Sequence, residues 1–462
     1  MSEDKKLNMP QSLLLLLLII GAVAVCIRLK TGGPMIGLFM SWIIIYLFCK
    51  VLRINYEHVV NGAYDAIRVV VPTLCLLMAI GVMIGTWLQS GTIATIIVGG
   101  LKLINPTWLL PLTLIFCAVL SLVTGTSYGS VGSAGVAMMA IGNAMGIHPD
   151  MVAGAVICGA MFGDKLSPLS DTTNLAPAVA GSKLNDHVRS MLWTTLPTFV
   201  ISLVLFVILG ISQTSGNYEN GNLLTYIDAL QGEFKLGFIT LLPAIAIIIL
   251  LLCKVNAVVS LGLSAICAGA VSFFYQGATL QSIIRVAYNG YSTSIEEGIL
   301  QTILNRGGMS SMLQYVAIIC FAVGMGGMLD RLGVLGNLLN AIVNHINSDG
   351  SLIAASLLVG YVTSLISCSQ PMSHVLTGNM MKPLFKSRKI APEILSRTLE
   401  DAGTLSGPMI PWHGYCVYMS GTLGVAWSIF FPYLFLLYLT PLFSIFYGFT
   451  GISIRHTDGA QN

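Results

Sequence analysis

The sequence predicts an all-α polytopic membrane protein with about ten to twelve elements at membrane depth, some of them broken or re-entrant. Of the 462 residues, 55% are hydrophobic and only 9% are charged, whereas a soluble globular protein carries about 25% charged residues. Apolar runs separated by short polar breaks recur along the whole chain. These observations exclude a soluble enzyme, a disordered chain and a disulfide-rich secreted protein, and the net charge of +3 gives no indication of nucleic-acid binding.

The first element is an apolar run over residues 13–27, which we expect to be a retained helix because no small-residue cleavage site follows it. The longest polar stretch, residues 213–235, lies near the middle of the chain and includes GNYENGN. We expect it to connect a first membrane repeat with the N-terminal helix, residues 1–212, to a second membrane repeat, residues 236–462.

The two halves share a spacing of small residues and prolines. His148-Pro149 is followed 243 residues later by Ala391-Pro392. Three glycines recur at nearly the same offset, and the pairs are Gly81 with Gly324, Gly85 with Gly327, and Gly91 with Gly333. One such match is weak in a chain with 48 glycines, but a nearly constant offset predicts two structural repeats, the usual plan of secondary transporters.

The hydrophobic pattern of the first repeat fails over residues 162–177, FGDKLSPLSDTTNLAP. The segment holds Asp164, Asp171 and Asn174 with one lysine, four hydroxyl side chains and two prolines. Proline opens a helix, and an opened helix exposes carbonyl oxygens that suit Na⁺ and N–H groups that suit an anion. The alternative is an aqueous loop, but acids at membrane depth mark ion pathways.

The second repeat has a similar break at residues 397–414, RTLEDAGTLSGPMIPWHG, which contains Asp401, Thr404 and Ser406. Upstream of each break lies a small, hydroxyl-rich interruption, TGTSYGS at 124–130 and SCSQPMSH at 367–374. Such residues also permit close helix packing. Their pairing with the breaks favours one site built by four converging interruptions, to which Thr126, Ser127 and Ser369 belong.

Proton coupling has two kinds of candidate. His374 and His413 flank the breaks and could relay protons, although a lone histidine is more often a packed or capping residue. Asp164 and Asp401 precede proline-containing breaks, and burial at membrane depth makes it easier for a carboxyl group to hold a proton. Lys165 and Arg397 oppose this role, because pairing with either cation would make the acids structural.

The two break motifs, FGDKLSPLSDTTNLAP and LSRTLEDAGTLSGPMIPWHGYCVYMSGTLGV, resemble those of the NhaC family of Na⁺/H⁺ antiporters over most of the chain. The resemblance implies inverted repeats, re-entrant hairpins and a homodimer that works as an elevator. It also implies an ion or substrate site, with the following matching residues: Asp164, Ser170, Asp171, Thr172, Thr173 and Asn174 in the first repeat, and Asp401, Thr404 and Ser406 in the second. Members of the wider group exchange malate and lactate, or amino acids.

We therefore expect a multi-pass transporter of the cell membrane rather than an enzyme, namely a Na⁺(Li⁺)/H⁺ antiporter. Na⁺ and H⁺ are its substrates, Asp171 and Asn174 are expected to ligate Na⁺, and no cofactor is expected. The alternative is a Na⁺- or H⁺-coupled exchanger of an organic anion or amino acid on the same scaffold, with Lys165, Asn174, His374 and His413 as possible anion donors. A channel or structural protein fits two matched breaks less well, and no GxxxxGK[ST] motif for ATP-driven pumping is present.

Overall fold

The computed structural model describes residues 6–29, 33–214, 221–293, 304–337 and 346–457, and these residues are mostly helical. Among them, eight helices are long and apolar enough to cross a membrane, and up to eleven spans result if each bent helix pair counts as one. The predicted all-α polytopic fold is confirmed. The predicted connector at 213–235 lies partly outside the described residues, and its described part contains helix α11 (Gly221–Glu233).

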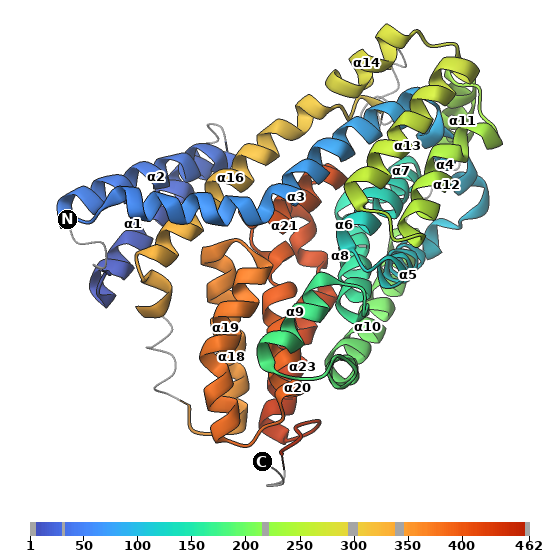
Figure 1. Cartoon of the computed structure of the whole chain (residues 1–462). Helices are drawn as coiled ribbons and strands as arrows, with labels where there is room; N and C mark the ends of the chain where they lie inside the picture. Colours follow the sequence, from blue (N-terminus) through green and yellow to red (C-terminus); the bar gives the residue numbers. More distant parts are fainter. Residues whose placement is uncertain (1–5, 30–32, 215–220, 294–303, 338–345, 458–462) are drawn as a thin grey trace.

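The first half of the chain forms long helices joined by short turns (Figure 1). Their bounds are α1 Met9–Arg28, α2 Gly33–Leu52, α3 Tyr56–Gln89, α4 Thr92–Leu103, α5 Pro106–Thr124, α6 Ser127–Ser130, the π-helix η1 Val131–Gly135, α7 Val136–Ala144, α8 Pro149–Leu166, α9 Asp171–Ala180 and α10 Leu184–Thr214. The elements α6, η1 and α7 follow one another without a break, so residues 127–144 form one continuous helix.

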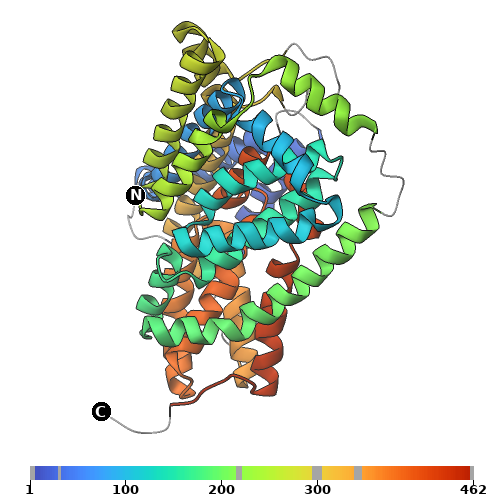
Figure 2. The same cartoon turned by 90° about the vertical axis from the view of Figure 1, so that its right-hand side faces the viewer.

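The second half continues from α11 with a similar series of helices. Their bounds are α12 Phe238–Leu252, α13 Ala257–Val271, η2 Ser272–Gln276, α14 Leu280–Asn289, α16 Met309–Arg331, α18 Asp349–Ser367, α19 Gln370–Ser387, α20 Pro392–Leu399, η3 Glu400–Thr404, η4 Gly407–Met409, α21 Gly414–Leu423, α22 Trp427–Phe430, η5 Phe431–Tyr433 and α23 Phe435–Thr450. Figure 2 shows α10 as a long helix along one side of the molecule, where it packs on α5 and α23.

Helix boundaries repeat between the halves at one constant offset. Helix α5 at 106–124 and α18 at 349–367 differ by 243 residues at both ends, as do α9 at 171–180 and α21 at 414–423. The continuous helix 127–144 corresponds in the same way to α19 at 370–387. The structure thus places breaks at equivalent positions of the two halves.

Glycines bring the backbones of paired helices into contact. A Cβ atom on Gly159 would lie 2.3 Å from the carbonyl oxygen of Leu114, and one on Gly163 would lie 2.2 Å from that of Ala118. Only glycine permits so close an approach. The last turn of α8 is therefore fixed against α5, and the next two residues after Gly163 are Asp164 and Lys165.

Candidate functional site

A cavity of about 520 Å³ lies where the four interruptions of the helices meet. Four segments at the interruptions line it: Thr124–Thr126 with Tyr128, Leu169–Thr172, Cys368–Pro371 and His413–Tyr415. The rest of the lining comes from Asp164, parts of α3, Ile319 of α16 and the turn between α12 and α13. The segments that the sequence singles out on hydrophobicity alone are therefore neighbours in space. A cavity of this size holds a small organic solute as well as an ion.

Equivalent positions of the two repeats line this cavity with different side chains. Thr126 and Ser369 are the N-cap residues of the continuous helix 127–144 and of α19, and they are 243 residues apart. Ser170 and His413 are likewise the N-caps of α9 and α21. Asp171, the first residue of α9, corresponds to Gly414. Helix boundaries recur between the two halves at this offset, but the acidic groups do not.

Asp164 supplies the buried acid of the cavity, with only 7% of its surface exposed. The hydroxyl of Ser127 donates a hydrogen bond to Asp164 Oδ2, and the Tyr415 hydroxyl donates to the same atom over 3.4 Å. The hydroxyls of Ser170 and Thr172, which also line the cavity, lie 3.2 Å apart. A cation here would meet a carboxylate and hydroxyl oxygens, which are hard ligands.

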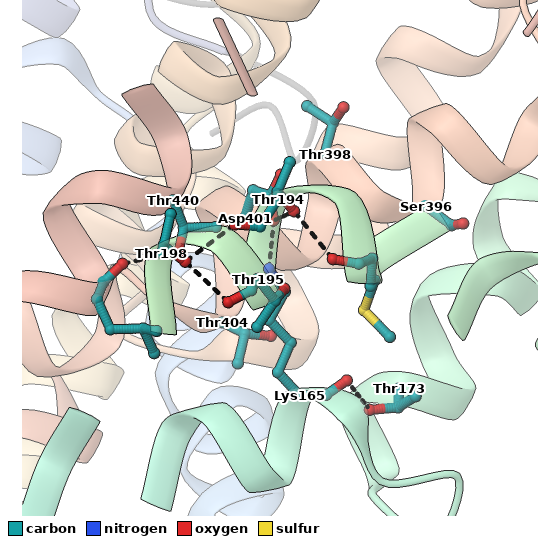
Figure 3. Close-up of polar contacts among 12 residues, drawn as sticks. Lys165, Thr173, Thr194, Thr195, Thr198, Ser396, Thr398, Asp401, Thr404 and Thr440 are labelled. Carbon is teal, nitrogen blue, oxygen red and sulfur yellow. Dashed lines mark hydrogen bonds and ion pairs between the residues drawn. The ribbon is translucent and has the colours of Figure 1, made fainter. Parts of the chain in front are cut away.

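Lys165 turns away from the cavity and forms a buried ion pair with Asp401 (Figure 3). Both side chains are fully buried, and they join α8 of the first repeat to η3 of the second. The Thr194 hydroxyl also donates to Asp401 Oδ1 over 3.1 Å. Beyond Thr194, the Thr198 hydroxyl lies 3.1 Å from that of Thr440, so the polar cluster continues into α10 and α23.

Several residues expected at the site do not line the cavity. The Asn174 amide donates to the carbonyl oxygens of Pro168 at 2.9 Å and Ser170 at 2.7 Å, so it braces the loop before α9. The Thr173 hydroxyl donates to the carbonyl of Lys165, and Ser406 donates to that of Gly403.

His374 does not line the cavity either. Its Nε2 lies 3.1 Å from the Thr404 hydroxyl. Of the two histidines predicted as proton relays, only His413 lines the cavity. Of the donors expected for an anion, Lys165, Asn174 and His374 all have other partners. Ion binding by any of the expected residues stays a prediction.

The sequence alone does not indicate three of the lining residues. Lys254 and Asn256 occupy the turn between α12 and α13, a short polar interruption of two apolar runs. Such a break is also typical of an ordinary turn between membrane helices, so it carries no signal of a site. Tyr415 follows the second break by one residue and is buried, and only the fold brings its hydroxyl to Asp164.

Comparison with known proteins places the chain in a transporter family. The model of the Na⁺/H⁺ antiporter family matches residues 159–452. The chain is 35% identical over 460 residues to the Na⁺/H⁺ antiporter NhaC of Alkalihalophilus pseudofirmus, and this covers 99% of both chains. It is also 35% identical to the malate-2H⁺/Na⁺-lactate antiporter of Bacillus subtilis, covering 91% of this chain and 90% of the relative.

Two further proteins are similar, one in sequence and one in structure. The arginine/ornithine antiporter ArcD of Halobacterium salinarum is 32% identical over 88% of this chain and 84% of its own. The solved structure of MtrF from Neisseria gonorrhoeae, which represents a class of antimetabolite efflux pumps, aligns over 85% of this chain and 83% of its own with a TM-score of 0.38 and 11% identity. From the family model and the near full-length relatives, the chain is a multi-pass membrane transporter, not an enzyme, and belongs to the NhaC-type Na⁺/H⁺ antiporter family.

Proposed function

We propose that the chain is a Na⁺(Li⁺)/H⁺ antiporter that works by alternating access, with Asp164 as the group for which Na⁺ and H⁺ compete. The observation that carries the proposal is the position of Asp164, a buried acid facing a cavity at which four broken helices meet. One carboxyl group that holds either load, but not both, couples the two fluxes. Acids at membrane depth are costly and are kept for such roles.

The remaining first-repeat groups complete the proposed cation site. Ser170 and Thr172 would offer hydroxyl oxygens, and Asp171, exposed at the start of α9, would draw cations to the entrance. Na⁺ and H⁺ are the substrates, and the proposal requires no resident cofactor. Assembly as a homodimer, with residues 1–212 and 236–462 as inverted membrane repeats, is part of the same proposal.

The test is proton movement in proteoliposomes driven by a Na⁺ gradient, with an internal pH dye and no organic solute. Asp164→Asn keeps the shape of the side chain and removes its charge, so exchange should fall at least about tenfold while the protein still purifies folded. Asp228→Asn, at an exposed position of α11, is the matched control and should exchange at the wild-type rate. Wild-type exchange in Asp164→Asn would remove Asp164 from the site.

A second candidate is exchange of an organic solute coupled to Na⁺ or H⁺. The volume of the cavity favours it, because 520 Å³ far exceeds the space that a bare ion needs. The same proteoliposomes separate the two functions. Proton movement with Na⁺ alone supports the first, and strict dependence on lactate, malate or an amino acid supports the second.

A further inference from the structure

We infer that the cavity also holds a small organic carboxylate, and that Lys254 is the residue that selects its negative charge. This inference rests on the proposed function only in taking the cavity as the transport site. Hydrogen-bond donors line the cavity from the turn between α12 and α13 and from the starts of α19 and α21, whereas both of its acids come from α8 and α9. Na⁺ and a carboxylate would thus be held by different groups of one cavity.

Lys254 is a cation without a partner at this cavity. It lies in the turn between α12 and α13 and lines the cavity near Val255 and Asn256. Its side chain makes no hydrogen bond or ion pair with any residue in the described parts of the chain. The other charged side chains that line the cavity are Asp164 and Asp171. Once cations balance these two acids, Lys254 leaves an excess positive charge that suits an anion.

His413 adds a donor whose direction follows from its backbone contact. Its Nδ1 accepts the backbone N–H of Tyr415 at 3.0 Å, so a neutral ring must carry its proton on Nε2. That Nε2 is buried and has no partner among the described residues. Ser369, only 3% exposed, has a hydroxyl that is likewise unpaired there. Two buried donors that line a cavity and lack partners point to an acceptor that enters from outside.

The helix starts beside these donors also favour negative charge. Helix α19 has 18 residues, and its N-cap residue, Ser369, makes no side-chain hydrogen bond to the first turn, so the Ser369 side chain does not cap the N-terminal N–H groups. Pro371, the second residue of α19, has no backbone N–H, so this position adds no unsatisfied donor to the first turn. A carboxylate can accept from an ammonium, a hydroxyl, an imidazole N–H and helix N–H groups, and donors of each of these kinds line the cavity.

The experiment compares lactate with lactamide, which has nearly the same shape and no charge. Binding of each to purified full-length protein is measured by calorimetry in Na⁺ buffer, with malate as a second carboxylate. Wild-type protein should bind lactate at least about tenfold more tightly than lactamide. Lys254→Gln should lose most of that discrimination, Lys254→Arg should keep it, and Lys102→Gln, an exposed lysine outside the cavity, should behave as wild type.

Each outcome decides between distinct claims. Loss of discrimination in Lys254→Gln, with an unchanged unfolding temperature, supports the inference. Equal discrimination in Lys254→Gln and wild type overturns the role of Lys254. Absence of lactate and malate binding in a wild-type protein that still exchanges Na⁺ for H⁺ overturns the carboxylate site and leaves the proposed function intact. Carboxylate binding in a protein that never exchanges Na⁺ for H⁺ supports the carboxylate site and overturns the proposed antiport.

Discussion

The fully buried Lys165 and Asp401 side chains join the two repeats through one ion pair. Removing one partner of such a pair leaves an uncompensated charge in an apolar interior, which costs about 3–5 kcal/mol, whereas replacing both with apolar residues is often neutral. We therefore predict that Lys165→Met or Asp401→Asn lowers the unfolding temperature in detergent sharply, and that the double variant Lys165→Met/Asp401→Leu regains most of the loss.

The same variants separate a structural pair from a proton carrier. If the pair is structural, the folded fraction of Asp401→Asn keeps the wild-type shape of its pH profile for Na⁺ exchange. A flattened profile in protein of wild-type stability would instead assign proton transport to Asp401. Asp228→Asn, an exposed acid on α11, provides the control for both measurements.

Glu400 precedes Asp401 in η3 and is also fully buried, yet neither of its carboxyl oxygens makes a hydrogen bond among the described residues. An ionised carboxylate in that position would be very costly. Glu400→Gln keeps the shape and removes the charge, so we predict an unfolding temperature equal to or above that of wild type. A strong loss of stability would show that Glu400 carries a needed charge.

Which residues lie at the cavity could be predicted best where a break in an apolar helix marks them. Thr126, Ser170, Ser369 and His413 occupy breaks in apolar helices, and all four line the cavity. Ion pairs between residues far apart in the sequence could not be predicted in this way. Lys165 and Asp401 are 236 residues apart, and nothing local indicates that they meet rather than face the cavity. Partners at such separation are fixed by helix packing, which the sequence pattern leaves open.

At the scale of elements, the position of Asp164 depends on how closely α8 approaches α5. Gly163 and Gly159 face carbonyl oxygens of α5 at distances that leave no space for a methyl group. We predict that Gly163→Ala pushes the end of α8 outward, lowers the unfolding temperature, and reduces Na⁺-driven exchange more than its effect on folding accounts for. Thermal unfolding and flux are measured on the same preparation.

Gly262 of α13 gives the matched control, because no atom lies within 4 Å of a Cβ placed there. Gly262→Ala should be neutral, or slightly stabilising through the helix propensity of alanine. An unperturbed Gly163→Ala protein would show that α8 can shift without cost. Proline and polar residues in the sequence predict the helix breaks, but the sequence does not predict which glycines contact the backbone of a neighbouring helix.

At the scale of the whole molecule, the constant offset of 243 residues makes a prediction about sidedness. In inverted repeats, the turn before α8 at 145–148 and its equivalent before α20 lie on opposite sides of the membrane. The second turn contains Arg388 and Lys389 and follows Lys382 and Lys386, and this cluster favours the cytoplasm. In a variant without reactive cysteines, Ser387→Cys should be labelled only from the cytoplasm and His148→Cys only from outside.

Both positions are suited to labelling because both side chains are exposed. Labelling of the two cysteines from the same side would contradict inverted repeats and leave the transport proposal untouched. Labelling from opposite sides in the reverse sense would keep the repeats and invert the chain in the membrane. Composition and hydrophobic periodicity predict the all-helical membrane fold, whereas the predicted orientation of the chain in the membrane depends on a few lysines and arginines.

The two halves share helix boundaries but not side-chain chemistry, and this difference has a consequence for their origin. Asp171 corresponds to Gly414, Ser170 to His413, and Asp164 to Gly407, so the acids of the cavity come from one half alone. A duplicated ancestor with two identical halves would have carried either paired acids or none at its centre. The two halves therefore offer different side chains to the cavity, and a second copy of one half would not supply those of the other. Fusing two first halves should therefore yield a protein with excess negative charge at its axis and no complementary donors.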